Sequence, residues 1–364
     1  MNSSKCVLNI NLDIIAQNYK TLQTLCPQAE VGAAVKTNCY GLGVKDISPT
    51  LIKHGCCHFF VANCEEGLFL RNIIGSSANI YILNGFFREE ANILIEYNLI
   101  PVLFNLEQIL LWQQCSTRLN KRLKCIININ TGMYRLGMSD ADFYKFVSMD
   151  IKELDILYLM SHLASSEEKD NISNQIQLNK FNAQTSLLPH IKKTFANSGG
   201  IFLGSDYQFD LVRPGAALYG INLELSNKHS KYLQNPLELH APIIHLNELG
   251  VGESVGYNST YTNTSNKSCR IATIPIGFAD GFCRSLSNKG ATYINGIKAP
   301  VIGLVSMDST IIDVSSVPKK DLFLGQKVEI IGNNSKLSHI SSNANTNEYE
   351  ILTRLGTRFK RVYI

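Results

Sequence analysis

Residues 31–43 read VGAAVKTNCYGLG, an apolar run that ends in Lys36 and passes at once into Asn38, Tyr40 and two glycines. Short apolar runs bounded by turn residues are typical of the buried strands of a parallel sheet. Lys36 has two interpretations. A lysine at a strand end most often extends its ammonium into solvent. Alternatively, burial disfavours the ammonium, lowers the lysine pKa and leaves an amine that can form a Schiff base.

Eight apolar runs of this kind alternate with stretches of helical periodicity between about residues 30 and 220, which predicts βα units and a parallel sheet. Eight such units close most simply into a (β/α)8 barrel. We therefore expect an α/β protein with a TIM-like barrel over residues 8–235, including a helix at 174–188. The runs are VGAAV, HFFVAN, NIYILNG, IPVLFN, LKCIININ, LDILYLMSHL, KTFANS and FDLVRPGAALYG.

The pattern changes beyond about residue 235, where alternating strands are separated by turn residues. Asn295-Gly296 predicts a hairpin with a type I′ turn. The polar stretch 333–347 has the composition of an exposed loop. We expect a second, mostly β domain over residues 236–364, completed by an N-terminal strand at residues 1–7.

The composition is that of a globular protein, with 45% hydrophobic and 18% charged residues in a chain of 364. The net charge of +4 comes from basic residues dispersed among acidic ones, so neither nucleic acid nor a membrane is an expected partner. The first residues lack the apolar core of a signal peptide, and no run of about 18 apolar residues is long enough to span a bilayer. We expect a cytoplasmic protein.

Ten cysteines show no disulfide framework and are expected to remain thiols in a reducing compartment. The stretch HGCCH at residues 54–58 contains metal-ligand types, but it lacks the CxxC spacing and the second ligand pair of a structural zinc site. No metal site is predicted.

Polar residues follow several predicted strands, at the end of the barrel where (β/α)8 enzymes carry their active sites. Ser198 with two following glycines, and Gly215 with Ala216, could offer a hydroxyl and backbone N–H groups to a phosphate. A lysine facing such a site suggests pyridoxal phosphate, which carries an aldehyde and a phosphate on one ring. The strand-end candidates are Lys36, Tyr40, Arg135, His162, Asn197, Ser198, Arg213 and Gly215.

Each of these candidates also has a simpler interpretation. Glycine pairs after a strand are most often turns. Arg213 could equally be salt-bridged at the surface of its domain, and His162 could be a hydrogen-bonded barrel histidine. The residues alone leave these alternatives open.

The chain nevertheless resembles the alanine racemases, the fold-type III pyridoxal phosphate enzymes. AVKTNCYGLG (residues 34–43) resembles their cofactor-lysine motif AVKANAYGHG. Eight motifs occur in the family's order between Ala34 and Ser315, which makes chance agreement implausible. The other seven are NTGMYRLGM, HLASSEE, ANSGG, LVRPGAALYG, VGYNSTYTN, TIPIGFADGFCRSLSN and APVIGLVSMDSTIIDVS.

The resemblance implies a pyridoxal phosphate enzyme that interconverts L- and D-alanine and supplies D-alanine for peptidoglycan. Lys36 would bind the cofactor and act as one acid–base group. Tyr257 would be the second, supplied by the β domain of the other subunit of a homodimer with shared active sites. Two groups on opposite sides of a planar intermediate can remove a proton from one face and return it to the other.

The resemblance also implies cofactor and substrate contacts. Arg213 would face the pyridine nitrogen, and Arg135 would orient the cofactor and the substrate carboxylate. The implied cofactor-binding residues are Lys36, Tyr40, His162, Asn197, Ser198, Arg213, Gly215 and Ala216, and the implied substrate-binding residues are Arg135, Met307 and Asp308.

Four positions depart from the family pattern. Leu42 replaces a histidine, and Phe278 replaces a tyrosine near the entrance. Asn128 stands where many members carry a carbamylated lysine, so an anion such as chloride could take that place. Thr357 lies roughly where some members have a phosphate-binding tyrosine.

Two other readings remain for this sequence. One is a related barrel enzyme, a broad-spectrum amino-acid racemase or an amino-acid decarboxylase; decarboxylases generally place an acidic residue where this chain has Arg213, and the broad-spectrum racemases carry a signal peptide. The other is a non-catalytic pyridoxal phosphate carrier, which would lack the β domain that bears Tyr257 and Met307.

Overall fold

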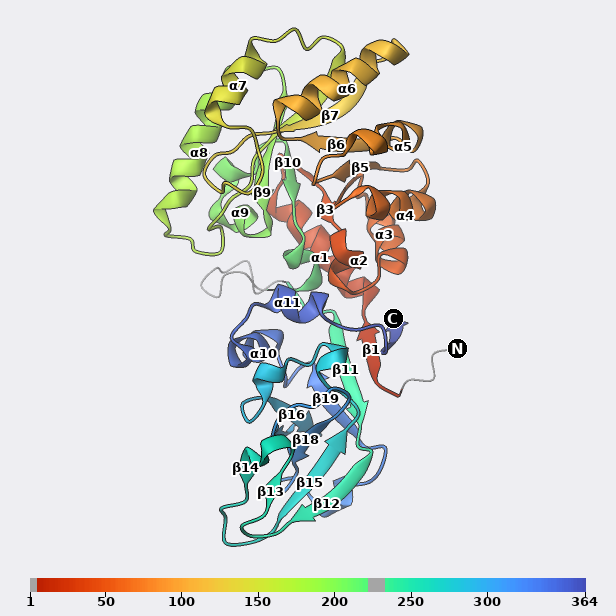
Figure 1. Ribbon diagram of the computed structural model, residues 1–364, viewed down its shortest axis with the longest axis vertical. Coiled ribbons are helices and arrows are strands. Elements are labelled where there is room, and N and C mark those ends of the chain that lie inside the picture. Colours follow the sequence, from red (N-terminus) through yellow and green to blue (C-terminus); the bar gives the residue numbers. More distant parts are fainter. Residues whose placement is uncertain (1–4, 222–232) are drawn as a thin grey trace. The chain divides into compact units, whose positions relative to one another are not determined.

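The computed structural model describes residues 5–221 and 233–364. The chain forms two compact units (Figure 1). The barrel unit comprises Ile14–Cys39 and Gly43–Gln234, and the β unit comprises Met1–Asp13, Tyr40–Leu42 and Asn235–Ile364. Of the strand expected at 1–7, residues 1–4 lie outside the described part, and the strand at this end is β1 (Val7–Ile10).

The barrel unit contains a parallel sheet whose segments pair in the order β2-β10-β9-β8-β7-β6-β5-β4-β3. The end segments, β2 (Glu30–Val31) and β3 (Ala33–Ala34), are halves of one strand interrupted at Gly32. Because β2 pairs with β10 and β3 pairs with β4, the nine segments close into a barrel of eight strands. The predicted TIM-like barrel is confirmed. The other strands are β4 (His58–Val61), β5 (Asn79–Ile82), β6 (Leu99–Leu103), β7 (Leu123–Asn128), β8 (Leu154–Met160), β9 (Lys192–Asn197) and β10 (Leu211–Arg213).

Helices lie between the strands and around the outside of the barrel (Figure 1). The helix expected at 174–188 is α8 (Ile172–Thr185), which begins earlier because the Asn171 side chain caps it by accepting the Ser173 N–H. The other helices of this part are α1 (Leu12–Leu25), α2 (Lys36–Tyr40), α3 (Val44–Lys53), α4 (Cys64–Ile74), α5 (Ala91–Glu96), α6 (Leu106–Leu119), α7 (Asp140–Val147) and α9 (Ser198–Leu203), with short 3-10 turns η1 (Arg88–Glu90), η2 (Ser205–Tyr207) and η3 (Ala216–Tyr219).

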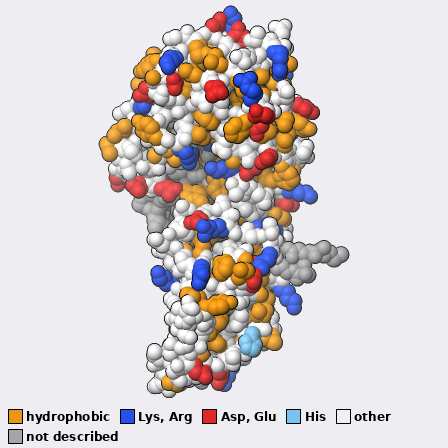
Figure 2. Space-filling model, in the orientation of Figure 1, with side chains coloured by type: hydrophobic (Ala, Val, Ile, Leu, Met, Phe, Trp, Pro, Cys, Tyr) orange, Lys and Arg blue, Asp and Glu red, His pale blue; other side chains and the backbone are white. Residues whose placement is uncertain are grey.

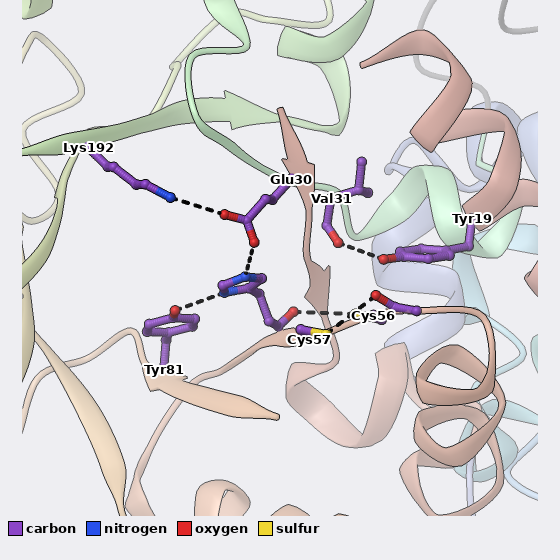
Figure 3. A network of polar contacts seen from close by, with 9 residues as sticks. Tyr19, Glu30, Val31, Cys56, Cys57, Tyr81 and Lys192 are labelled. Carbon is purple, nitrogen blue, oxygen red and sulfur yellow. Dashed lines mark hydrogen bonds and ion pairs between the residues drawn. The ribbon is translucent and has the colours of Figure 1, made fainter. Parts of the chain in front are cut away.

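A polar network lies at the ends where several barrel strands begin (Figure 3). Glu30 begins β2, His58 begins β4 and Lys192 begins β9. His58 Nε2 lies 2.7 Å from Glu30 Oε2, and His58 Nδ1 lies 2.9 Å from the Tyr81 hydroxyl. Lys192 Nζ lies 3.4 Å from Glu30 Oε1. This end of a TIM barrel serves stability rather than chemistry, so the network is a structural one.

The network makes barrel stability depend on pH through Glu30. Burial raises the pKa of the Glu30 carboxyl, but the hydrogen bond and charge of His58 and the charge of Lys192 outweigh burial and lower the pKa below 4.5. A carboxyl with a lowered folded-state pKa stabilises the fold above its unfolded pKa, and this contribution is lost as pH falls through the folded value.

We therefore expect Glu30→Gln to be less stable than the parent chain near neutral pH, by no more than about 1 kcal/mol because Glu30 is half-exposed. The difference should shrink as pH falls below about 4. Thermal unfolding of both proteins across this range measures it. A difference that stays constant with pH would show that the Glu30 charge contributes nothing.

The β unit contains sheets of six, three and two strands, in the orders β17-β16-β19-β11-β1-β20, β12-β15-β18 and β13-β14. Asn295 and Gly296 have φ of 50° and 80°, as a type I′ turn requires, so the predicted hairpin is confirmed. The bounds are β11 (Leu237–Pro242), β12 (His245–Leu249), β13 (Ser254–Val255), β14 (Tyr261–Thr262), β15 (Cys269–Ile274), β16 (Ala291–Ile294), β17 (Ile297–Pro300), β18 (Thr310–Asp313), β19 (Lys327–Ile331), β20 (Lys360–Tyr363), α10 (Leu337–Ala344) and α11 (Glu348–Thr353), with η5 (Tyr257–Ser259), η6 (Phe278–Asp280), η7 (Arg284–Leu286) and η8 (Lys319–Asp321).

The expectation of an exposed loop over residues 333–347 is wrong. Helix α10 occupies most of that stretch. Its Leu337, Ile340 and Ala344 are buried, and this spacing places them on one face of the helix. Serine, histidine and asparagine at the other positions conceal this short apolar face in the sequence.

All ten cysteines are free thiols, and Cys57 alone is exposed. Acidic and basic side chains are interspersed on the face drawn in Figure 2. Within residues 5–221 and 233–364, every helix is too short or too polar to span a bilayer.

Candidate active site

Lys36 directly follows the first barrel strand and begins α2. The side chain is half-buried. Burial lowers the pKa of the Lys36 ammonium, the positive charge of Arg135 lowers it further, and the carboxylate of Glu66 opposes both effects. Of the two interpretations of this lysine, the structure therefore favours the one in which burial disfavours the ammonium.

The backbone after Lys36 forms a left-handed turn. Residues Thr37–Tyr40 have φ between 53° and 56°, although none of them is glycine. This conformation costs about 1–2 kcal/mol per residue, so other contacts must hold it. Glu66 Oε1 accepts the Thr37 N–H at 2.7 Å, and Asn38 Oδ1 accepts the Val44 N–H at 2.8 Å.

Sequence reasoning missed Glu66, which is both a brace for this turn and the carboxylate that acts on Lys36. Its second oxygen accepts the Ala62 N–H at 2.8 Å. Asn63, three residues earlier, caps α4 by accepting the Glu66 N–H. The Asn-x-x-Glu spacing is a helix-start signal that could have directed attention to this residue.

Arg213 ends β10 and is only 5% exposed. Its Nη1 donates to Thr194 Oγ1 at 2.7 Å, and its Nη2 donates to the carbonyl oxygens of Ser161 and Phe195 at 2.7 and 3.2 Å. All of these acceptors are neutral, so the alternative of a surface salt bridge is wrong. Burial lowers the pKa of Arg213 to about 9, which still leaves the side chain cationic at neutral pH.

His162 lies beside Arg213 after β8. Its Nδ1 is 3.2 Å from Arg213 Nη2, and since arginine can only donate, Nδ1 must be the acceptor. Burial lowers the pKa of His162 well below 6.5, and the charges of Arg213, Arg135 and Lys36 lower it further. The ring is therefore neutral, with its proton on Nε2.

The Ser198 hydroxyl, which follows β9, accepts hydrogen bonds from backbone N–H groups that follow β10. Its Oγ accepts the N–H groups of Gly215 and Ala217 at 2.9 and 3.2 Å, with Ala216 between them at the start of η3. Asn197 caps α9, since its Oδ1 accepts the Gly200 N–H at 2.9 Å. The Ser198 hydroxyl keeps its own hydrogen to donate and lies beside the backbone at the start of η3, which makes this a suitable place for an anion.

Arg135 is exposed in the loop after β7. Asn130 shapes this loop, because its Oδ1 accepts the N–H groups of both Gly132 and Tyr134 at 3.1 Å. Lys36, Arg135 and Arg213 all belong to the barrel unit, and the electrostatic effects on Lys36 and His162 connect them. The strand ends thus bring two arginines and Lys36 together with the carboxylate of Glu66, and the two arginines favour an anionic ligand.

The remaining predicted residues belong to the β unit. The side chains of Tyr257, in η5, and Met307 are 67% and 55% exposed. Asp308 is held by Arg358, which also pairs with the buried Asp280, each at 2.6 Å. The backbone of Met307 packs so closely on Gly277 that a Cβ there would lie 2.4 Å from the Met307 carbonyl oxygen. Met307 and Asp308 therefore sit on a well-supported loop.

The departures from the family pattern have different structural settings. Leu42 is completely buried, and its carbonyl oxygen accepts the Tyr363 hydroxyl at 2.9 Å. Asn128 is buried at the end of β7. Phe278 is 41% exposed.

Another tyrosine ring lies near Tyr40, and it belongs to a helix that precedes position 357. Thr357 is exposed, whereas the ring of Tyr349 in α11 lies 6.3 Å from the ring of Tyr40. Tyr349 lies outside the eight family motifs of the sequence, which end at Ser315.

Two family models together match nearly the whole chain: "Alanine racemase, N-terminal domain" over residues 10–223 and "Alanine racemase, C-terminal domain" over residues 236–363. The chain thus has the two domains of an amino-acid racemase, a class of isomerase: a barrel with cationic strand ends and then a β domain. The chain belongs to the alanine racemase family.

Individual relatives agree with this assignment. The alanine racemase of Rickettsia africae is 49% identical over 363 residues, 99% of each chain. The structure of the Bartonella henselae alanine racemase with covalently bound pyridoxal phosphate superimposes with a TM-score of 0.94 at 40% identity, covering 99% of each chain. The Acinetobacter baumannii alanine racemase gives a TM-score of 0.90 at 29% identity, also over 99% of each chain. The resemblance predicted from the sequence is confirmed, and the roles of individual residues remain predictions.

Proposed function

We propose that this chain is a pyridoxal phosphate-dependent alanine racemase that acts as a homodimer with shared active sites. In this proposal, residues 8–235 bind the cofactor and residues 236–364 supply groups to the active site of the partner. The proposal depends chiefly on one observation, a buried and carboxylate-free Arg213 in the same unit as a lysine of lowered pKa.

The residues present fit pyridoxal phosphate. The four hydrogen bonds of Arg213 all come from its Nη atoms, which leaves Nε for an uncharged acceptor such as a pyridine nitrogen. The Lys36 amine would bind the cofactor's aldehyde carbon. Ser198, the N–H groups around Gly215 and Ala216, and Tyr40 would hold the phosphate, while Asn197 would act through the cap of α9.

Bound pyridoxal phosphate would withdraw electrons from the substrate α-carbon and make its hydrogen acidic. Lys36 would move this proton on one side of the cofactor and Tyr257 on the other. The neutral His162 can donate from Nε2 to a phenolate oxygen, which would favour Tyr257 as a base. Arg213, always cationic near neutral pH, would keep the ring nitrogen unprotonated and suppress side reactions such as transamination.

Substrate selection would involve both units. Arg135 would bind the substrate carboxylate, and Met307 and Asp308 of the partner would border the substrate side chain. Tyr257 and Met307 are large side chains that are exposed in the single chain. A second subunit that covers them would account for this exposure, which supports a role across a subunit boundary.

We also propose a cytoplasmic enzyme whose D-alanine serves peptidoglycan synthesis. Ten free thiols suit a reducing compartment. The role of D-alanine in peptidoglycan synthesis is inferred from membership of the alanine racemase family.

Purified protein incubated with pyridoxal phosphate and L-alanine in heavy water should form D-alanine with deuterium at the α-carbon. Chiral analysis of a panel of amino acids defines the substrate range. Release of carbon dioxide would replace the proposal with a decarboxylase, and a yellow protein that exchanges no α-hydrogen would replace it with a carrier.

A further inference from the structure

Gln177 of α8 connects the loops that follow β7 and β8. The side chain is 2% exposed. Its Nε2 donates to Thr131 Oγ1 at 3.0 Å and to the His162 carbonyl oxygen at 2.9 Å, and its Oε1 accepts the Ala164 N–H at 2.9 Å. One amide thus binds both sides of the His162–Ala164 segment and the first residues of the Arg135 loop.

The network continues from Gln177 to the buried arginine. Thr131 Oγ1 lies 2.8 Å from Ser161 Oγ. The carbonyl oxygen of Ser161 accepts from Arg213 Nη2 at 2.7 Å, and the same Nη2 donates to His162 Nδ1 at 3.2 Å. Thr131, Ser161 and Gln177 are each 2% exposed, so water does not substitute for these bonds.

Only an amide of this length provides the required bonds. Both Nε2 hydrogens are used as donors, and Oε1 is used as an acceptor. Glutamate could accept from Ala164 but could not donate to the His162 carbonyl oxygen. Methionine has a similar shape and can do neither.

We propose that Gln177 is a positioning residue of the active site, which holds His162 in the orientation that accepts from Arg213 and sets the start of the Arg135 loop. This inference rests on the proposed racemase function. Gln177 touches neither substrate nor cofactor in this proposal, and it acts through the backbone of residues 162–164 and through Thr131.

The pKa of His162 can be used to measure whether this positioning is intact. Three cations face the ring from three elements: Arg213 from β10, Arg135 from the loop after β7 and Lys36 from the turn after β3. Burial and these charges keep the pKa of His162 well below its ordinary value. When the His162–Ala164 segment loses its anchor, water should reach the ring and the pKa should rise toward the ordinary value of about 6.5.

The test compares Gln177→Met with Gln184→Met in the holoenzyme. Gln184 lies on the same helix and is 4% exposed, but its side-chain amide donates to Asp140 and not to the His162–Ala164 segment. Hydrogen–deuterium exchange at the imidazole C2 position, followed by mass spectrometry over a range of pH, measures the pKa of His162 without relying on activity. We expect the pKa to rise in Gln177→Met and to stay unchanged in Gln184→Met.

Kinetics provide the second readout. In Gln177→Met we expect kcat to fall about 10- to 100-fold, as for a misplaced catalytic group, with little change in KM for alanine and with the cofactor absorbance retained. Gln177→Asn, which keeps the amide but shortens its reach, should show the same direction of change and serves if the methionine variant does not fold.

An unchanged His162 pKa in a folded Gln177 variant would overturn the inference, as would equal effects of the Gln177 and Gln184 substitutions. These outcomes are distinct from failure of the proposed function, because that failure would appear in the parent chain as absence of α-hydrogen exchange.

Discussion

Lys36→Ala should lose its racemase activity by at least about 10³-fold and should not turn yellow when pyridoxal phosphate is added. The substitution removes the only amine placed directly after the first barrel strand, whose pKa burial and Arg135 lower. Both the covalent attachment of the cofactor and one of the two proton-transfer groups are lost. Absorbance in the visible range and chiral analysis of the product measure the two losses separately.

Lys192→Ala is the matched control for this substitution. Lys192 also belongs to a barrel strand, but it begins β9, at the end where the strands start, and pairs with Glu30. This variant should keep both its colour and its activity. A Lys36→Ala protein that still binds the cofactor covalently would contradict the assignment of Lys36.

Tyr257→Phe should reduce turnover by about 10²- to 10⁴-fold, the range expected for loss of a general acid–base group. Because the phenol would serve one face of the substrate, exchange of the α-hydrogen should fall far more for one alanine enantiomer than for the other. The cofactor spectrum should not change. Deuterium incorporation into L- and D-alanine, measured separately, checks this asymmetry, and equal loss for both enantiomers would argue against a role as one base.

Mixing the two inactive variants tests whether the active site is shared. In a homodimer with Lys36 from one subunit and Tyr257 from the other, a hybrid of Lys36→Ala and Tyr257→Phe contains one site with both native groups. Random exchange of subunits should therefore restore about one quarter of the parent activity. No recovery after confirmed subunit exchange would place both groups on one chain.

The barrel and the main site candidates could be predicted because they depend on local sequence signals. Each barrel strand is a compact apolar run, and polar residues such as Lys36 and Arg213 interrupt the pattern at the strand ends. The Asn295-Gly296 turn is equally local, since both residues readily adopt positive φ.

Other features depend on contacts between residues distant in sequence. Gly32, where the first strand divides, leaves no room for a side chain, because Phe60 and the His58 carbonyl oxygen each lie 3.0 Å from where a Cβ would be. The left-handed turn of Thr37–Tyr40 is held in part by Glu66. Gln177 is bonded to Ala164 and Thr131, which lie 13 and 46 residues from it in the sequence. The spacing of apolar residues along the sequence does not reveal these contacts between distant residues.

The path of the chain limits how this protein can be divided. β1 is an inner strand of the six-stranded sheet, paired with β11 on one side and β20 on the other, although more than 200 residues separate it from both. A gene split after residue 234 would leave the second fragment with two unpaired strand edges where β1 belongs. Separate production of a barrel fragment and a β fragment would thus yield at least one aggregation-prone piece.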